Sequence, residues 1–279
     1  MRPFNIFKHL SVVAFTFLAL GHSWAPAEEP GVVTFYAMGD VPYTPEDDAI
    51  LPKQIAALPS DAEFVVHLGD IKGGSTPCDE AVFIKVAGML RKSAHRLFIV
   101  PGDNEWNDCK NPAPAWDYWE KYFMKFDRHW ENVLLVARQE ERRENFTFLH
   151  KGTLFIGINL VGGKVHDAEE WKTRHRQDAD WIRKQVEKNG EESRCMVLFG
   201  HAQPATKHAD FFAPFVEIAG KYGKPILYLH GDGHRWIRDN PFEAKNILRV
   251  QVDQGGIASP VKVIVGEDDE SPFVFERRK

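Results

Sequence analysis

Five apolar runs in this chain each end at a glycine followed by an acidic residue or a histidine. They are Val33 to Asp40, Phe64 to Asp70, Leu97 to Asp103, Met196 to His201 and Ile226 to Asp232. Runs rich in β-branched and aromatic residues are typical of buried strands, and glycine lets the backbone turn sharply where such a strand ends. Because α/β folds place their chemistry at the carboxyl ends of strands, we expect the five terminal side chains to meet at one edge.

The chemistry of these strand ends predicts a metal centre. Asp40, Asp70, Asp103 and Asp232 would repel one another without a cation, and His201 and His234 add imidazoles to the set. Carboxylates and imidazoles together suit divalent metals, and a carboxylate shared between two ions is a common arrangement in two-metal hydrolytic sites. A single Gly-Asp pair is more often a turn, so the prediction depends on the fivefold repetition.

The order of expected elements indicates an α/β fold. Apolar side chains recur at helical spacing over 79–92 and 177–188, and strand, helix and strand alternate in the first hundred residues. That alternation predicts a largely parallel sheet, whereas short β-like runs at 247–252, 261–265 and 273–275 suggest a second, mixed sheet. We expect a four-layer αββα sandwich, with two mixed sheets flanked by helices, in a single domain of residues 28–279.

An aromatic segment lies between these halves, at 111–126. It carries Trp116, Tyr118, Trp119, Tyr122 and Phe123. A lid or substrate platform is one interpretation, and an aromatic helix packed on the core is the other, because aromatic side chains dominate core burial.

The N-terminus has the features of an export signal. Arg2 and Lys8 precede an apolar stretch from Leu10 to Leu20, and residues 25–27 form a small-x-small cleavage site. The stretch is shorter than the roughly 20 residues that span a bilayer, so we expect removal of residues 1–27 and no stable membrane insertion afterwards, with an uncleaved anchor as the alternative. The protein would then be periplasmic or secreted.

The net charge argues against one class of partner, and the cysteines fit an exported protein. The full chain has a net charge of −5, and loss of two N-terminal cations would make it −7, which argues against nucleic acid as a partner. Cys78 and Cys109 lie in predicted loops just after strand ends, and export favours a disulfide between them. Cys195 adjoins an apolar run, so we expect a buried free thiol.

The five strand ends, in order, resemble the motif blocks of the calcineurin-like metallophosphoesterase superfamily. Its blocks D-x-H, G-D, G-N-H-D/E, H and G-H-x-H correspond to Gly39-Asp40-Val41-Pro42, Gly69-Asp70, Gly102-Asp103-Asn104-Glu105, Gly200-His201 and Gly231-Asp232-Gly233-His234. The match extends from residue 32 to about residue 252. Pro42 replaces a metal-ligating histidine, Asp103 and Asn104 replace the usual Asn-His pair, and Asp232 replaces the first histidine of the last block.

This resemblance implies a ligand set for two divalent ions. Asp70 would bridge them, with Asp40 and His234 on one ion and Asp103, His201 and Asp232 on the other. Because Pro42 has no donor atom, Tyr43 or water would complete the first ion. The oxygen-rich set accepts Mn²⁺, Fe, Mg²⁺ or Ca²⁺, and the two histidines also allow Zn²⁺.

The resemblance also implies roles in catalysis. Asn104 and His201 would be catalytic, although an amide can donate a hydrogen bond to a phosphoryl oxygen but cannot act as a general acid. Lys72 could contact phosphate or be solvated. Glu105 and Asp108 could orient ligands or favour a helix N-terminus.

The leading hypothesis is therefore an exported hydrolase, a metal-dependent phosphoesterase. Its substrate would be a small phosphomonoester or phosphodiester, attacked by a metal-bound hydroxide in a two-metal mechanism. The chief alternative is a non-catalytic, metal-binding relative that binds a ligand or partner, which Pro42 and Asn104 favour. A structural calcium site is a third interpretation, but such sites usually take their ligands from one contiguous loop.

Overall fold

Two β-sheets packed face to face form the centre of this protein in a computed structural model that describes residues 1, 29–131 and 134–277. The predicted signal segment, apart from Met1, lies outside the described residues. The first sheet has five strands in the order β12-β11-β1-β2-β3. These strands are β1 (Val33–Met38), β2 (Phe64–His67), β3 (Leu97–Ile99), β11 (Val261–Val265) and β12 (Phe273–Glu276). β1, β2 and β3 are parallel, and β11 pairs antiparallel with β1.

The second sheet has seven strands in the order β4-β5-β6-β7-β8-β10-β9. They are β4 (Ala137–Arg138), β5 (Phe146–His150), β6 (Thr153–Gly157), β7 (Cys195–Phe199), β8 (Ile226–His230), β9 (Ile237–Asp239) and β10 (Ile247–Gln251). The four strands β6, β7, β8 and β10 are parallel, while the edge strands are antiparallel. Both sheets therefore have a parallel centre whose strands can end at a common edge.

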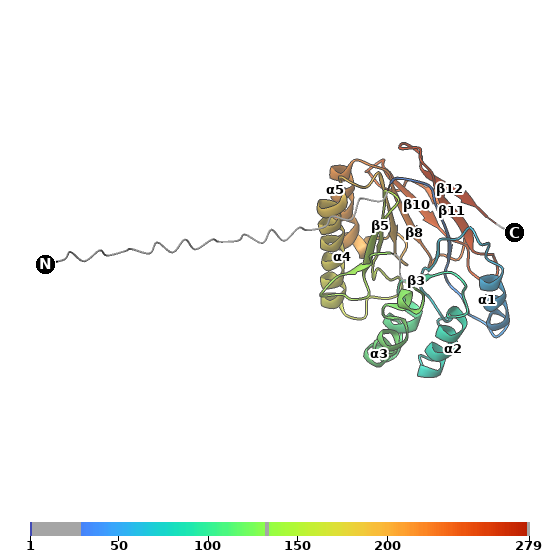
Figure 1. Cartoon of the computed structure of the whole chain (residues 1–279). Helices are drawn as coiled ribbons and strands as arrows, with labels where there is room; N and C mark the ends of the chain where they lie inside the picture. The colour runs from blue at the N-terminus through green and yellow to red at the C-terminus, as the bar shows by residue number, and fades with distance from the viewer. Residues whose placement is uncertain (2–28, 132–133, 278–279) are drawn as a thin grey trace.

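Helices cover the outer face of each sheet (Figure 1). The helices α1 (Asp47–Ala56), α2 (Glu80–Leu90) and α3 (Pro112–Phe123) lie on the five-stranded sheet, and α4 (Ala168–Asn189) and α5 (Ala209–Tyr222) lie on the other. Short helical turns occur at Asp103–Asn107, Phe126–His129 and Thr206–His208. The expected four-layer αββα sandwich is confirmed. None of the described helices combines the length and apolar character needed to span a bilayer.

The alternation of side chains along the strands produces the layers. Phe35 and Ala37 of β1 point between the sheets, whereas Met38 faces the helices. Between the sheets, aromatic rings pack closely: the ring centroids of Phe35 and Phe64 lie 4.9 Å apart and are stacked. Because this apolar interior is closely packed, it holds the strands in position, and with them the side chains that follow the strand ends.

The C-terminal strands differ from the sequence-based expectation. We expected the three C-terminal runs to form a second sheet, but only β10 joins the seven-stranded sheet. β11 and β12 return to the first sheet, beside β1. The pairing of β11 with β1 joins segments far apart in the sequence. The alternation of apolar and polar residues in a short strand does not predict which strand it pairs with. α4 is also longer than the helix expected at 177–188, since its N-terminus is capped by Asp167.

The aromatic segment belongs to the core. Within α3, Trp119 and Phe123 are buried in the cluster that fills the space between the five-stranded sheet and its helices. Trp116 stacks on Trp119 with ring centroids 5.1 Å apart. These contacts describe a packed helix rather than a free lid.

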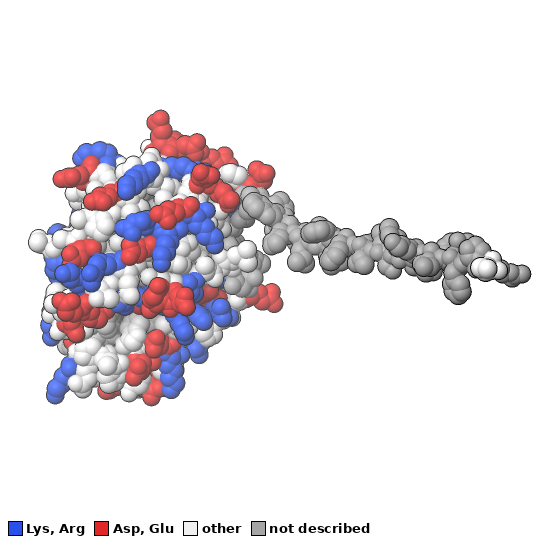
Figure 2. All heavy atoms as spheres, turned by 90° about the vertical axis from the view of Figure 1, so that its left-hand side faces the viewer, with Lys and Arg blue, Asp and Glu red and all other residues white. Residues whose placement is uncertain are grey.

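A disulfide joins Cys78 and Cys109, as predicted, across a sequence separation of 31 residues. It ties the loop after β2 to the loop after β3. The third cysteine, Cys195, is a buried free thiol. On the face that carries α4 and α5, acidic and basic side chains are interspersed without a broad patch of one sign (Figure 2).

Candidate metal centre

Five strand ends from both sheets converge at one edge of the sandwich. Asp40, Asp70 and Asp103 follow β1, β2 and β3 of the first sheet, and His201 and Asp232 follow β7 and β8 of the second. Asp40, Asp70, Asp103 and His201 are at most 6% exposed. Buried charges of one sign are unfavourable unless a cation accompanies them, so their convergence needs compensation.

The backbone at this edge is strained. Asp40, Asp70, Asp232 and His234 have φ angles of 57°, 59°, 70° and 58°. They make up four of the six non-glycine residues with positive φ in the described part of the chain. L-residues rarely adopt this conformation, and strain of this kind is concentrated at functional sites, where the surrounding structure enforces it.

Two glycines permit the close approach of the carboxylates. A Cβ on Gly102 would lie 2.2 Å from Oδ1 of Asp70, and one on Gly162 would lie 2.7 Å from Oδ1 of Asp103. Any side chain at either position would displace a carboxylate. Gly102 belongs to the recognised motif, whereas Gly162 follows an apolar run with no acidic partner in sequence, so sequence reasoning missed it.

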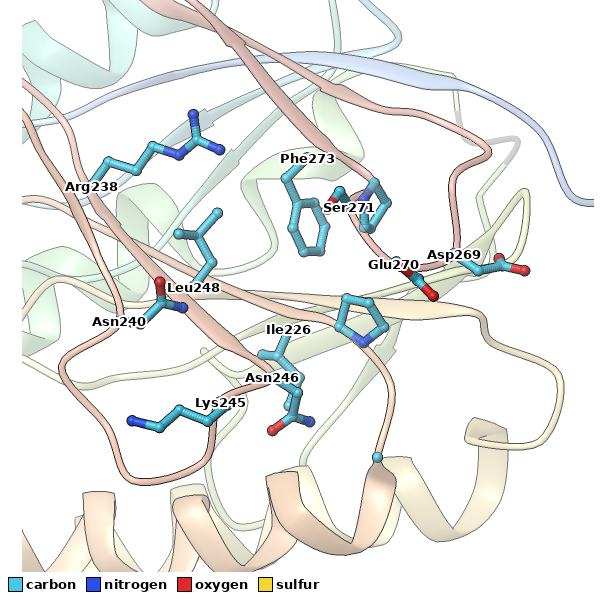
Figure 3. Close-up of a pocket in the computed structure, with 13 residues that line it drawn as sticks. Ile226, Arg238, Asn240, Lys245, Asn246, Leu248, Asp269, Glu270, Ser271 and Phe273 are labelled. Carbon is cyan, nitrogen blue, oxygen red and sulfur yellow. The ribbon is translucent and has the colours of Figure 1, made fainter.

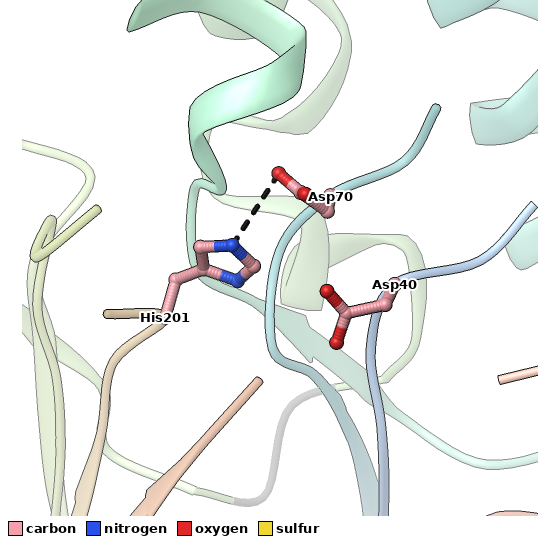
Figure 4. Close-up of side chains that lie close together, drawn as sticks. All are labelled: Asp40, Asp70 and His201. Atoms are coloured by element: carbon pink, nitrogen blue, oxygen red, sulfur yellow. Dashed lines mark ion pairs between the residues drawn. The ribbon is translucent and has the colours of Figure 1, made fainter. Parts of the chain in front are cut away.

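His201 is oriented as a metal ligand would be. Its Nδ1 lies 2.7 Å from the carbonyl oxygen of Leu68, which fixes a proton on Nδ1 and leaves Nε2 directed at the carboxylates. Nε2 lies 3.4 Å from Oδ1 of Asp70 (Figure 4). It also lies 3.1 Å from Oδ1 of Asp103. Apart from these ion pairs, neither Nε2 nor Oδ1 of Asp103 has a hydrogen-bond partner among the described residues, although both are buried.

The protonation of His201 reflects this surrounding charge. Burial would lower the pKa of His201, but the carboxylates of Asp70 and Asp103 outweigh it and raise that pKa well above its usual value. Burial, together with the charge of Asp70, raises the pKa of Asp103 to about 6. A proton on the imidazole thus balances the carboxylates, and a divalent ion would displace it.

The donor atoms form two overlapping groups that fit a divalent ion. Asp40, Asp70 and His201 each offer one atom within 4.8 Å of the others, and so do Asp103, His201 and Asp232. His201 belongs to both groups, whereas the resemblance assigns the shared position to Asp70. The mixture of carboxylate oxygens and one imidazole nitrogen suits a borderline divalent metal.

On the other side of the centre lies Tyr43. Its hydroxyl donates to Oδ2 of Asp70 at 2.6 Å, and its oxygen also lies 3.1 Å from Oδ1 of Asp40 and 3.2 Å from Nε2 of His234. Burial, with the charges of Asp70 and Asp40, raises the pKa of Tyr43 far above its usual value. His234 also lies 3.4 Å from Oδ1 of Asp40, and its side chain is 45% exposed.

Asn104 contacts the carboxylate of Asp70, and Glu105 contacts the backbone just after β3. The backbone N–H of Asn104 donates to Oδ1 of Asp70 at 2.9 Å, and its side-chain amide donates to Oδ2 at 2.5 Å. Glu105 is fully buried and accepts a 2.6 Å hydrogen bond from the N–H of Gly102. Burial and the nearby Asp70 raise the pKa of Glu105 to about 8. Asp108, by contrast, accepts from the backbone of Lys164.

Lys72 is not a solvated surface lysine. Its side chain is buried at 2% exposure, and its ammonium donates to the carbonyl of Gly73 at 3.2 Å. Burial lowers the pKa of Lys72, while Glu105 and Asp70 oppose that change. The expectation of a solvated loop residue is therefore wrong, because the loop after β2 folds back over the acidic edge.

A pocket of about 460 Å³ lies at the opposite ends of β8 and β10 (Figure 3). Arg238, Lys245, Asp269 and Glu270 surround it. A smaller hollow of about 140 Å³, lined by Tyr43, Lys72 and Thr76, adjoins the metal centre. The larger pocket contains none of the converging side chains, so the candidate site lies at the strand ends and not there.

No family model and no curated protein matches this sequence. Several solved structures match it in shape. GAP50, described as the anchor in the inner membrane complex of Plasmodium, has a TM-score of 0.57 and 11% identity over 88% of this chain and 84% of its own. PhoD has a TM-score of 0.56 and 9% identity, over 91% of this chain and 70% of its own. The chain shares the fold of these two proteins.

A 5'-nucleotidase from Candida albicans shares the same architecture. Its TM-score is 0.54 and its identity 10%, over 90% of this chain and 51% of its own. The present chain therefore corresponds to about half of that enzyme. At these identities the likeness concerns the fold alone, so the roles of individual residues have to be argued from the geometry of this chain.

Proposed function

We propose that this protein is a metal-dependent phosphoesterase that hydrolyses a small phosphomonoester or phosphodiester. The observation that carries the proposal is the convergence of buried carboxylates on the imidazole of His201, whose Nε2 lies 3.1 Å from Asp103 Oδ1 and 3.4 Å from Asp70 Oδ1. Buried carboxylates need a compensating cation, and a divalent ion would supply more positive charge than the imidazole proton does. The metallophosphoesterase-type fold supports hydrolysis as the use of such an ion.

The residues that would hold metal are the six expected from sequence. Asp103, His201 and Asp232 would bind one ion, and Asp40, Asp70 and His234 are the proposed set for another. Bound divalent ions would lower the pKa of a water and neutralise charge on the phosphoryl oxygens. The oxygen-rich donors leave Mn²⁺, Fe, Mg²⁺, Ca²⁺ and Zn²⁺ as the ions to test.

The chain's own side chains would position these donors. Leu68 holds the imidazole of His201, and the two N–H groups of Asn104 hold the carboxylate of Asp70. Asn104 therefore acts on Asp70 in this structure, and an amide supplies no proton to a leaving group. Lys72 adds a buried positive charge beside Asp70, which would favour an anionic phosphoryl group by its field.

A hydrolysis assay with metal replacement tests the proposal. The protein is stripped of metal, refilled singly with each of the five ions, and given an aryl phosphate monoester and the matching diester. We expect ion-dependent turnover that Asp70→Asn reduces by about three orders of magnitude, corresponding to ~4 kcal/mol of transition-state stabilisation. Asp61→Asn, an exposed acid paired with Lys262, is the matched control and should keep full activity.

Absence of turnover with every ion, in protein that binds metal, would contradict the proposal. It would favour the second candidate, a non-catalytic relative that binds a ligand or partner. Pro42, Asn104 and the buried hydroxyl of Tyr43 at the centre favour this candidate. The name of GAP50, an anchor, shows that one protein with this fold is described by its attachment and not by an activity.

We also propose that the protein is exported to the periplasm or secreted. The disulfide Cys78–Cys109 supports this, because disulfides persist in oxidising compartments. Cell fractionation with detection of the processed N-terminus tests it. Recovery of unprocessed protein with reduced cysteines in the cytosol would contradict it.

A further inference from the structure

The hydroxyl of Tyr43 lies among the donors expected to bind one of the two ions. Its distances are 2.6 Å to Asp70 Oδ2, 3.1 Å to Asp40 Oδ1 and 3.2 Å to His234 Nε2. The resemblance assigns these same three residues to the first ion. The side-chain amide of Asn104 also donates to this hydroxyl, at 3.3 Å. The phenol oxygen therefore already lies at the position among Asp40, Asp70 and His234 that an ion bound by these three residues would take.

Contacts at both ends of the residue hold Tyr43 in this position. Its backbone N–H donates to Oδ2 of Asp47 at 2.9 Å, which anchors the loop after β1 to α1. Its ring meets the imidazole of His234 edge-on, with ring centroids 5.3 Å apart. The preceding residue, Pro42, has no side-chain donor for a metal. The local sequence thus removes one ligand and adds a neutral hydrogen-bonding group.

His201 limits the number of ions further. Both donor groups at the centre include this imidazole. Its Nδ1 is used on the carbonyl of Leu68, so only Nε2 can offer a lone pair to an ion, after loss of the proton that it holds against the carboxylates. One ring nitrogen binds one ion. The group of Asp40, Asp70 and His201 and the group of Asp103, His201 and Asp232 therefore compete for the same atom.

The two sides of the centre differ in what their atoms already contact. On the Tyr43 side, the phenol donates to Asp70 and its oxygen lies 3.1 Å from Oδ1 of Asp40. On the other side, Asp103 Oδ1 and His201 Nε2 contact each other at 3.1 Å and have no further hydrogen-bond partner among the described residues. An ion between Asp103, His201 and Asp232 would therefore have to displace only a proton, and no side chain occupies that position in the way that Tyr43 occupies the other.

We propose that the centre binds a single divalent ion, held by Asp103, His201 and Asp232, and that the Tyr43 hydroxyl takes the place of a second. This inference rests on the metal dependence proposed above and replaces the two-ion expectation with one. Tyr43 then holds Asp40 and Asp70 in place, and their negative charges stabilise the nearby ion without binding it directly.

Metal stoichiometry after equilibration with Mn²⁺ and removal of free ion tests the inference, with elemental analysis as the readout. We expect one Mn²⁺ per chain in the native protein and none in His201→Ala. The double variant Pro42→His with Tyr43→Phe restores a ligand and removes the hydroxyl, so it should bind two. Tyr222→Phe, whose hydroxyl contacts Ser193 elsewhere, is the matched control and should bind one.

Two ions in the native protein would overturn the inference, and so would a folded double variant that still binds one. Circular dichroism reports whether that variant folds; if it does not, Tyr43→Phe alone is titrated, and it should bind a second, weaker ion. Aryl phosphate turnover is measured on the same samples. Two ions with turnover contradict only the inference, one ion without turnover contradicts only the proposed function, and no ion contradicts both.

Discussion

Two polar clusters in this protein contain buried carboxylates, and the negative charge is compensated differently in each. One is the metal centre. The other, the α4 cluster, consists of Arg142, Glu144, Asn145, Arg174 and Asp178, between α4 and the loop before β5. In the α4 cluster, guanidinium groups accompany the acids: Arg174 donates to Glu170 at 2.9 Å, and Arg142 lies 3.6 Å from Glu144.

In the metal centre, no guanidinium group among the described residues pairs with the carboxylates. Among the described residues, the ion pairs that reach its carboxylates come from His201 and His234. In the α4 cluster, the Asn145 amide donates at 2.7 Å to both Gln139 and Asp178. A buried acidic cluster that is paired with guanidinium groups is thus structural, whereas carboxylates paired only with imidazoles can exchange the imidazole proton for a cation from outside.

Loss of the imidazole at the metal centre should have the largest effect. His201→Ala removes the only nitrogen common to both donor groups, so we expect kcat/KM for an aryl phosphate to fall by about 10³ or more, or ~4 kcal/mol. Steady-state kinetics measures the loss. Activity close to that of the native protein would mean that the two clusters do not differ in function.

A change in the α4 cluster should affect stability but not catalysis. Asn145 is fully buried, and its amide and carbonyl serve Gln139, Asp178 and the N–H of Asn159. Asn145→Ala leaves these groups unsatisfied and should lower the free energy of unfolding by about 3 kcal/mol. Urea unfolding measures this change. A comparable loss in metal affinity of the folded variant would show that the clusters are coupled.

The pH dependence of stability should show whether Asp178, in the α4 cluster, carries a proton in the folded protein. Burial raises the pKa of Asp178 to about 8, against the opposing effect of Arg142. The folded protein therefore keeps a proton that the unfolded chain releases above its ordinary pKa of roughly 3.9. Stability from this group is present at low pH and is lost as the pH rises towards 8.

Asp178→Asn should remove that dependence. Between about pH 5 and 7, the free energy of unfolding of the native protein should fall relative to the variant by up to about 1.4 kcal/mol per pH unit. Urea unfolding at a series of pH values gives the difference. Parallel curves for the two proteins would show that Asp178 is ionised in the folded state.

The sequence was sufficient to predict the layers of the fold and the edge at which the ligands meet. Buried strands that end in Gly-Asp or Gly-His have a local signature, and Asp40, Asp70, Asp103, His201 and Asp232 do converge. The predicted disulfide also formed. In each case, the information lay in short stretches of sequence at or just after a predicted strand end.

What the sequence did not reveal depends on contacts between distant segments. The pairing of β11 with β1 separates the C-terminal strands into two sheets, and no local pattern encodes it. The burial of Lys72 depends on how the loop after β2 packs against the rest of the chain. Tyr43 was a candidate ligand from sequence, but its hydrogen bond to Asp70 was not foreseen. The α4 cluster was missed because its members are polar residues that lie far apart in the sequence.

The most direct test of the account is thermal unfolding of metal-free protein with and without added divalent ion. A ligand that binds only the folded state stabilises it, by about 2.7 kcal/mol at a concentration one hundred times its Kd. We predict that an ion raises Tm in the native protein and in Asn145→Ala, but not in His201→Ala. An unchanged Tm in the native protein with every ion tested, or the same rise in His201→Ala, would contradict the account.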